Sequence, residues 1–436
     1  MPQKCNTLLQ RCIYYEPKRN DMKKALYFGI AALAIAGCSK FDAGEWFEGE
    51  FKGGDAYYES ADGGGGSVGG DNGNGQGQSG EAGVITAAEW NDLDNWAFWG
   101  NLMTSQSNAD PESENYVPSY SEYRYYWGLN TGSRFAVKVK DASGNPVVGA
   151  KIELKDESGK TLWKSVSDNK GLANLWADVF TKDPQTVTGS CTVAIDNVAM
   201  EGNPVMTSFN EEARLNEYVV AHTGVGNNVD IAFIVDATGS MTDEINFLKE
   251  DLLDILNRCA QIQSDKKLFT GAVFYRDQGD DYLTRVQGFS DNVTSTTSFV
   301  KKQEAAGGGD TPEAVHTALE VSLSDLQWHT NAYSRMAFII LDAPAHKDHQ
   351  GVVESMQKSI AAYSEKGIKL IPVFCSSYSK DCEFMCRQFA ILTGGTYVFL
   401  TNDSGVGGEH IQATVGEYQV EHLNDLIVRL ITSYIS

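Results

Sequence analysis

The stretch IAFIVDATGSM, Ile231–Met241, decides how this sequence folds. It begins with five apolar, largely β-branched residues, which indicate a strand buried on both faces. Asp236, Thr238 and Ser240 follow, and a helical pattern comes after them. One carboxylate and two hydroxyl groups therefore share a single turn at the carboxyl end of a strand. Because these three side chains offer only oxygen atoms, they suit a hard divalent cation, Mg²⁺ before Ca²⁺ or Mn²⁺.

Two later segments place oxygen atoms in the same kind of position. Residues 307–313 read GGGDTPE and precede a helical pattern at 314–326. Residues 335–341 form a second buried-strand pattern, and Asp342 follows it directly. Loops that follow parallel strands meet at the carboxyl edge of an open α/β sheet, where such folds bind their ligands. The three segments together predict one metal site, although either aspartate alone could simply cap a following helix.

On these three segments the chain resembles the von Willebrand factor type A family and its metal-ion-dependent adhesion site, over roughly residues 228–436. The resemblance implies a doubly wound, mostly parallel, Rossmann-like α/β sheet. It also implies a Mg²⁺ ligand set, which carries over to Asp236, Thr238, Ser240, Asp310 or Thr311, and Asp342. In this reading Asp236 and Asp342 orient water ligands. The hydroxyl groups of Thr238, Ser240 and Thr311 coordinate the ion directly.

The second of the three segments departs from the family's common Gly-Gly-Thr-x-Thr form, so either Asp310 or Thr311 could face the ion. With Thr311 as the ligand, the ion has two carboxylates beside it and stays electropositive enough to take an outside carboxylate, which favours adhesion. With Asp310 as a third carboxylate, the ion would be better neutralised, which favours a structural role.

From about residue 228 the sequence alternates between strand and helix patterns, which predicts a parallel sheet. The expected strands are 230–235, 268–275, 282–288, 335–341, 367–374 and 396–400. The expected helices are 241–262, 293–305, 312–326, 350–366, 381–393 and 418–434. The last helix has an apolar stripe, which predicts packing on the sheet rather than membrane contact.

The N-terminal region predicts attachment to a bacterial envelope. A basic Met22–Lys24 precedes a weakly polar to apolar run at 25–37, which is too short to span a bilayer but suits a signal-peptide core. The run ends in Ala-Gly-Cys, which resembles a bacterial lipobox and implies cleavage before Cys38 and lipid on that residue. We predict a leader and signal peptide over 1–38 and a lipid anchor at the outer membrane, facing either side. The alternative is an ordinary secretory signal with an incidental cysteine.

Three further segments are expected before the α/β domain. Residues 39–81 are rich in Gly, Ser, Asp and Asn and predict a flexible tether. Residues 82–132 are rich in aromatic residues, which are expected to pack on neighbouring domains, with stacking on sugars as the alternative. A helix is expected over Ala87–Met103 with Thr86 as its cap. Residues 133–205 alternate as strands do and predict a small antiparallel β-sandwich, similar to the carboxypeptidase-regulatory-like repeat, a spacer module.

Other residues carry weaker signals. Arg276 and Asp277 follow the second expected strand and could form a rim or outer contact of the metal site. Glu313 suits the first turn of a helix, so no site role is assigned to it. His346 and His349 lack a third zinc ligand, so a solvated loop is expected there.

Five cysteines follow Cys38, and their odd number leaves at least one unpaired. An envelope compartment permits a disulfide. We predict a surface bridge between Cys375 and Cys382, with packing of Cys382 and Cys386 in a helix as the alternative.

Composition and motifs narrow the function. The 436 residues carry a net charge of −23, which argues against nucleic-acid binding and suits a secreted or cell-surface protein. No nucleophile–base motif or phosphate-binding loop is found, so we predict a protein that is not an enzyme. The predicted function is divalent-cation-dependent binding of a partner protein that presents a carboxylate. An envelope scaffold with a structural metal and a metal-dependent hydrolase are the alternatives, and the membrane is contacted only through the N-terminal lipid.

Overall fold

The computed structural model describes the following residues: 81–105, 118–181, 190–209, 211–212, 214–221, 224–262, 265–309, 311–375, 379–404 and 411–436. All of them belong to one unit, Gln76–Ser436. The predicted signal peptide, Cys38, almost all of the tether and Asp310 lie outside these residues. None of the described helices is long and apolar enough to cross a bilayer.

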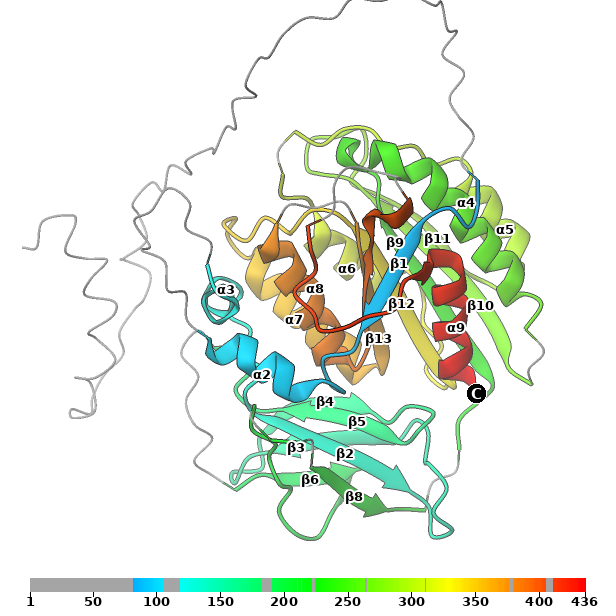
Figure 1. The fold of residues 1–436 in the computed structure, drawn as a ribbon. Coiled ribbons are helices and arrows are strands. Elements are labelled where there is room, and N and C mark those ends of the chain that lie inside the picture. Colours follow the sequence, from blue (N-terminus) through cyan, green and yellow to red (C-terminus); the bar gives the residue numbers. More distant parts are fainter. Residues whose placement is uncertain are drawn as a thin grey trace, which may run out of the picture. The chain divides into compact units, whose positions relative to one another are not determined.

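The centre of the α/β region is an eight-stranded sheet in the order β11-β10-β9-β12-β13-β14-β1-β15 (Figure 1). Its strands are β1 (Thr86–Trp90), β9 (Asn228–Asp236), β10 (Lys267–Tyr275), β11 (Thr284–Ser290), β12 (Ser334–Leu341), β13 (Ile368–Phe374), β14 (Tyr397–Leu400) and β15 (Glu421–His422). The five strands from β10 to β14 in this order run parallel, and β11 and β1 are antiparallel to their neighbours. The predicted doubly wound, mostly parallel sheet is therefore confirmed.

Helices cover both faces of this sheet (Figure 1). One face carries α4 (Thr242–Cys259), α5 (Val293–Val300) and α9 (Leu423–Ile435), and the other carries α6 (Val315–Asp325), α7 (Val352–Glu365) and α8 (Lys380–Thr393). Because both faces are covered, the central strands contain continuous apolar runs rather than an alternating pattern. Each fully buried Leu or Ile side chain contributes about 1.5–3 kcal/mol to folding, so these two cores fix the positions of the loops at the sheet edges.

The expected helix over Ala87–Met103 is wrong in its first part. Thr86–Trp90 is strand β1, hydrogen-bonded between β14 and β15, and a helix, α2, begins only at Trp96 and ends at Thr104. Ala87 belongs to the core under α9 and Ala88 to the core on the other face. A strand covered on both faces accepts such small residues, whereas their intrinsic preference is helical. The aromatic-rich segment therefore supplies a strand of the α/β sheet.

Most of the remaining aromatic side chains in that segment are buried. Helix α3 (Tyr120–Trp127) packs on α8, and Trp99 stacks on Phe384 with ring centroids 6.1 Å apart. Only Tyr125 and Tyr126 are exposed among the large aromatics of α3. The buried rings are not available to stack on a sugar.

The β-sandwich includes a strand that lies beyond its predicted boundary at residue 205. Its sheets are β5-β2-β8 and β4-β3-β6-β7. The strands are β2 (Arg134–Lys140), β3 (Lys151–Lys155), β4 (Thr161–Val166), β5 (Leu172–Trp176), β6 (Thr192–Ile195), β7 (Val198–Ala199) and β8 (Leu215–Val219). Strand β8 pairs parallel with β2, so the sandwich extends past residue 205 and is not wholly antiparallel. Its apolar residues Leu215 and Val219 are exposed, which is why a buried-face pattern did not reveal it.

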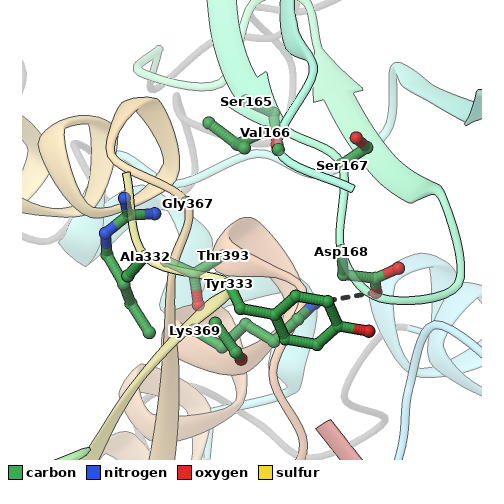
Figure 2. Close-up of a pocket in the computed structure, with 12 residues that line it drawn as sticks. Ser165, Val166, Ser167, Asp168, Ala332, Tyr333, Gly367, Lys369 and Thr393 are labelled. Atoms are coloured by element: carbon green, nitrogen blue, oxygen red, sulfur yellow. Dashed lines mark ion pairs between the residues drawn. The ribbon is translucent and has the colours of Figure 1, made fainter. Parts of the chain in front are cut away.

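The sandwich contacts the α/β region at the edge where β12 and β13 begin. The indole nitrogen of Trp163 donates to Ser364 Oγ at 3.0 Å, and Lys164 forms an ion pair with Glu365. A cavity of about 20 Å³ lies at this junction, and Lys369 and Asp168 form an ion pair of 3.1 Å in its wall (Figure 2). This volume holds about one water molecule, so the junction is a packed contact rather than a ligand pocket.

Candidate metal site

The first loop, residues 236–241, gathers three oxygen-bearing side chains at the end of β9. Asp236 Oδ1 accepts hydrogen bonds from the backbone N–H of Thr238 at 2.9 Å and from its hydroxyl group at 2.7 Å. Thr238 Oγ1 lies 3.1 Å from Ser240 Oγ. Asp236 and Thr238 are fully buried, and Ser240 is exposed. The loop thus holds the carboxylate of Asp236 in the interior and the hydroxyl group of Ser240 at the surface.

The third loop, residues 342–351, follows β12, the direct neighbour of β9 in the sheet. Burial and then the charge of Asp236 raise the pKa of Asp342 to about 7, and a hydrogen bond from Ser240 opposes the shift. Burial likewise raises the pKa of Asp236 to about 6. The predicted residues of the first and third loops therefore lie together, close enough to affect each other's ionisation.

The second loop, residues 301–314, packs beside the first. The N–H of Gly239 donates to the carbonyl oxygen of Gly307 at 3.0 Å, and the N–H of Ala306 donates to that of Ala237 at 3.0 Å. Thr311 is exposed, and Asp310 lies outside the described residues. The choice between these two as a ligand stays a prediction.

Glu313 also lies in this cluster, although no role in the site was predicted for it. Helix α6 begins at Val315, so Glu313 lies in an extended segment that forms a parallel bridge with Ala345. Its side chain is 2% exposed. Burial and then the charges of Asp236, Asp277 and Asp342 raise its pKa to about 9. The preceding proline is compatible with an extended segment as well as a helix start, so the sequence signal was ambiguous.

A second missed acid is Glu244, in the first turn of α4. It is 1% exposed, and its charge helps to raise the pKa of Asp342. An acid at this helix position is ordinarily explained by the helix dipole, so the sequence alone gave no reason to place it near the site.

Three carboxylate oxygens of this cluster are buried without a hydrogen-bond partner among the described residues: Asp236 Oδ2, Asp342 Oδ1 and Glu313 Oε2. Burying a polar group that forms no hydrogen bond costs several kcal/mol. A hard divalent cation among these oxygens would remove that cost, and the all-oxygen donor set fits Mg²⁺, Ca²⁺ or Mn²⁺.

In the described part of the chain, no group of three or more His, Cys, Asp or Glu side chains is arranged to hold a metal ion. A cation at this edge would therefore depend on the hydroxyl groups of Thr238 and Ser240 as well as on the two aspartates. The same finding gives no support for zinc at His346 and His349.

Arg276 and Asp277, the predicted rim residues, are both buried. Arg276 Nε donates to the carbonyl oxygen of Ala237 at 3.0 Å, and its Nη2 donates to that of Glu304 at 2.8 Å. Asp277 Oδ1 lies 2.8 Å from His346 Nε2. The expected solvated loop is thus wrong for His346, which is 5% exposed because it pairs with this carboxylate.

The predicted surface disulfide is also wrong. Cys375, Cys382 and Cys386 are buried free thiols. Cys382 forms a hydrogen bond with Cys386 one turn further along α8, and burial raises its pKa well above the ordinary thiol value. The alternative of two packing cysteines in a helix describes this arrangement.

Comparison with known proteins bears on the region that carries these loops. Residues 230–405 match the family model of the von Willebrand factor A domain. The alpha-protein kinase vwkA of Dictyostelium discoideum is 27% identical over 207 residues, 47% of this chain and 31% of that protein. An ariadne-like RING finger protein of Acanthamoeba polyphaga mimivirus is 33% identical over 124 residues, 27% of this chain and 11% of that protein. The chain thus spans less than a third of the length of either relative.

Two solved structures were also found. The conserved hypothetical protein BatB of Bacteroides thetaiotaomicron is 14% identical, with a TM-score of 0.32 over 47% of this chain and 98% of that one. An aerotolerance-related membrane protein of Bacteroides fragilis is 14% identical, with a TM-score of 0.31 over 48% of this chain and 98% of that one. The family match rests on the sequence, and residues 230–405 of this chain are a von Willebrand factor A domain.

Proposed function

We propose that this protein binds a partner protein through a divalent cation held at the carboxyl edge of its α/β sheet. The residues that would hold Mg²⁺ are Asp236, Thr238, Ser240 and Asp342, with Asp310 or Thr311 of the second loop. The observation that carries the proposal is the set of buried carboxylate oxygens at this edge that have no hydrogen-bond partner in the described part of the chain. When bound, the ion supplies an electropositive centre that an outside carboxylate can coordinate.

The exposure of the site supports binding from outside. Asp236 and Asp342 are buried, whereas Ser240 and Thr311 are exposed. A partner would therefore approach from the side of the hydroxyl groups, with the protein's own carboxylates behind the ion.

The buried glutamates favour a second candidate, in which the metal is purely structural and the protein is an envelope scaffold. Glu313 and Glu244 bring two further carboxyl groups to the cluster, and if they ionise beside a bound cation they would weaken its attraction for another carboxylate. Whether a carboxylate can displace a metal-bound water separates the two candidates.

The location and the absence of catalysis belong to the same proposal. The lipid anchor and the outer membrane rest on the Ala-Gly-Cys sequence that ends at Cys38. A metal-dependent hydrolase is a further alternative, but the imidazole in contact with Asp277, that of His346, is buried rather than open to a substrate. The kinase named among the relatives shares only part of its length with this chain.

The test uses the full-length chain loaded with one equivalent of Mn²⁺, whose bound water speeds the relaxation of solvent protons. Adding acetate should lower the relaxation rate saturably, because the carboxylate displaces that water, and neutral acetamide should not. An unchanged rate with acetate would favour the structural metal. Mn²⁺ binding that survives Asp236→Ala would contradict both candidates.

A further inference from the structure

The loop at residues 276–283, between β10 and β11, contacts all three loops of the candidate site. Arg276 donates hydrogen bonds to carbonyl oxygens of the first and second loops, those of Ala237 and Glu304. Asp277 contacts His346 of the third loop at 2.8 Å. A third residue, Asp280, contacts the second loop. The sequence had suggested only that this loop could form a rim.

Asp280 binds backbone N–H groups with both of its carboxylate oxygens. The N–H of Gly308 lies 2.9 Å from Asp280 Oδ2 and 3.1 Å from Oδ1, and the N–H of Asp277 lies 3.1 Å from Oδ2. Hydrogen bonds from an N–H to an ionised carboxylate are roughly twice as strong as neutral ones. Asp280 therefore ties the second loop to the 276–283 loop.

The backbone of the second loop is shaped to receive this carboxylate. Gly307 and Gly308 have φ values of +81° and +73°, the left-handed region that favours glycine. A Cβ atom at Gly307 would lie 2.3 Å from Asp280 Oδ1. Only glycine at this position allows the carboxylate to reach the N–H group of Gly308.

The contact leads directly to the first loop. The carbonyl oxygen of Gly307 accepts the hydrogen bond from Gly239, which lies between Thr238 and Ser240. Fixing Gly307 through Asp280 therefore also fixes the turn that presents these two hydroxyl groups.

We propose that Asp280 and Asp277 are positioning residues of the cation site: Asp280 holds the second loop, and Asp277 holds the third loop through His346. Neither is placed among the metal ligands, because the oxygens of Asp280 accept backbone hydrogen bonds and Asp277 Oδ1 is paired with the imidazole. The inference rests on the proposed function, since it assigns these residues to the same cation. Outer residues that orient metal ligands typically change affinity 10–100-fold when they are replaced.

The first test is calorimetric titration of Mg²⁺ into full-length variants. Asp280→Ala should weaken the affinity about 10–100-fold, Asp280→Asn should weaken it less because one acceptor oxygen remains, and Asp277→Ala should also weaken it. Asp281→Ala, at an exposed neighbouring position, is the matched control and should leave the affinity unchanged. An Asp280→Ala affinity within about twofold of the wild type would overturn the proposal.

A glycine pair supplies a steric version of the same test. Gly307→Ala should displace Asp280 and weaken Mg²⁺ binding as Asp280→Ala does. Gly309→Ala should leave binding intact, since a Cβ atom there meets nothing within 4 Å. Equal effects of the two alanines would overturn the proposal.

Hydrogen exchange of the metal-free protein separates this proposal from the proposed function. The Gly308 amide should be protected in the wild type and in Asp236→Ala but exchange faster in Asp280→Ala. If the wild type binds no Mg²⁺, the proposed function fails, and with it the positioning role, whatever the exchange shows. If Mg²⁺ binds and the Gly308 amide exchanges equally in all variants, only the positioning role fails.

Discussion

Asp230 and Asp236 lie at opposite ends of β9, and both side chains are fully buried. Asp230 accepts hydrogen bonds from His329, at 2.8 Å from its backbone N–H and 2.7 Å from its ring Nδ1. Asp236 accepts hydrogen bonds from Thr238 with one oxygen and leaves the other without a described partner. Equal burial thus accompanies a complete hydrogen-bond arrangement at one edge of the sheet and an incomplete one at the other.

The same contrast extends to the whole edges. Where the sandwich meets the α/β region, the charged groups are paired, as in Lys369 with Asp168 and Lys164 with Glu365. At the carboxyl edge, buried acids raise one another's pKa. A charge that is already paired needs no further partner, whereas buried acids that have no positive partner among the described residues point to a missing positive group.

Metal addition should give the largest effect. At a Mg²⁺ concentration about a thousandfold above Kd, the free energy of unfolding should rise by about 4 kcal/mol, because the ion binds the folded state alone. Chemical denaturation with Mg²⁺ and with EDTA measures this difference. Asp236→Ala should show no such rise, and a rise of equal size in that variant would place the ion elsewhere.

In the presence of EDTA, replacing Asp230 or Asp236 with alanine should lower the free energy of unfolding by different amounts. Asp230→Ala should destabilise the protein by about 2–3 kcal/mol, because it leaves the His329 donors without their buried acceptor. Asp236→Ala should cost less than about 1 kcal/mol, since losing an unpartnered buried carboxylate offsets the lost hydrogen bonds. Equal losses in denaturation experiments would argue that the two ends of the strand do not differ.

Asp251 tests whether a buried carboxylate with one oxygen that has no described hydrogen-bond partner always marks a metal site. It accepts a hydrogen bond from the N–H of Gly83, its Oδ2 has no described partner, and burial raises its pKa to about 6. An acid with a raised folded pKa gives stability that is complete below the unfolded pKa and is lost as pH rises through the folded pKa. Asp251→Asn should therefore match the wild type near pH 3.5 and exceed it by about 1–3 kcal/mol above pH 6.5.

That gain should not depend on Mg²⁺, because Asp251 lies on α4 and binds Gly83, neither of which belongs to the three loops. Denaturation curves at several pH values, with and without the ion, measure it. A stability difference that is unchanged between pH 3.5 and pH 6.5 would contradict the assigned titration.

The junction should give the smallest effect. Ser364→Ala removes the hydroxyl group that accepts from the Trp163 indole and donates to the carbonyl oxygen of Lys164. We expect a loss of about 1 kcal/mol in the free energy of unfolding and no change in Mg²⁺ affinity. A weaker affinity in this variant would show that the two edges of the sheet are coupled.

The sequence predicted the parts of the fold that depend on long apolar patterns. Strands β9 and β12 each contain a long apolar run because both faces of the sheet are covered, and the carboxylates at the ends of these runs were placed from that pattern. Strand β1 was missed because Ala87 and Ala88 favour a helix locally, and only the helices packed on both faces make a strand of them.

The candidate site was predicted where its residues follow strands directly. Glu313 and Asp280 were missed because their roles depend on contacts between segments far apart in the sequence: Glu313 pairs with Ala345, and Asp280 binds Gly308. Neither contact has a periodic signature. The predicted surface bridge between Cys375 and Cys382 failed because both thiols are buried and free, Cys375 directly after β13 and Cys382 in α8.

Calorimetric titration of Mg²⁺ into the full-length protein and its Asp236→Ala variant tests the cation site most directly. We expect saturable binding at one site in the wild type and none in the variant. No binding in the wild type, or binding that Asp236→Ala leaves unchanged, would contradict a cation site at the carboxyl edge of the sheet.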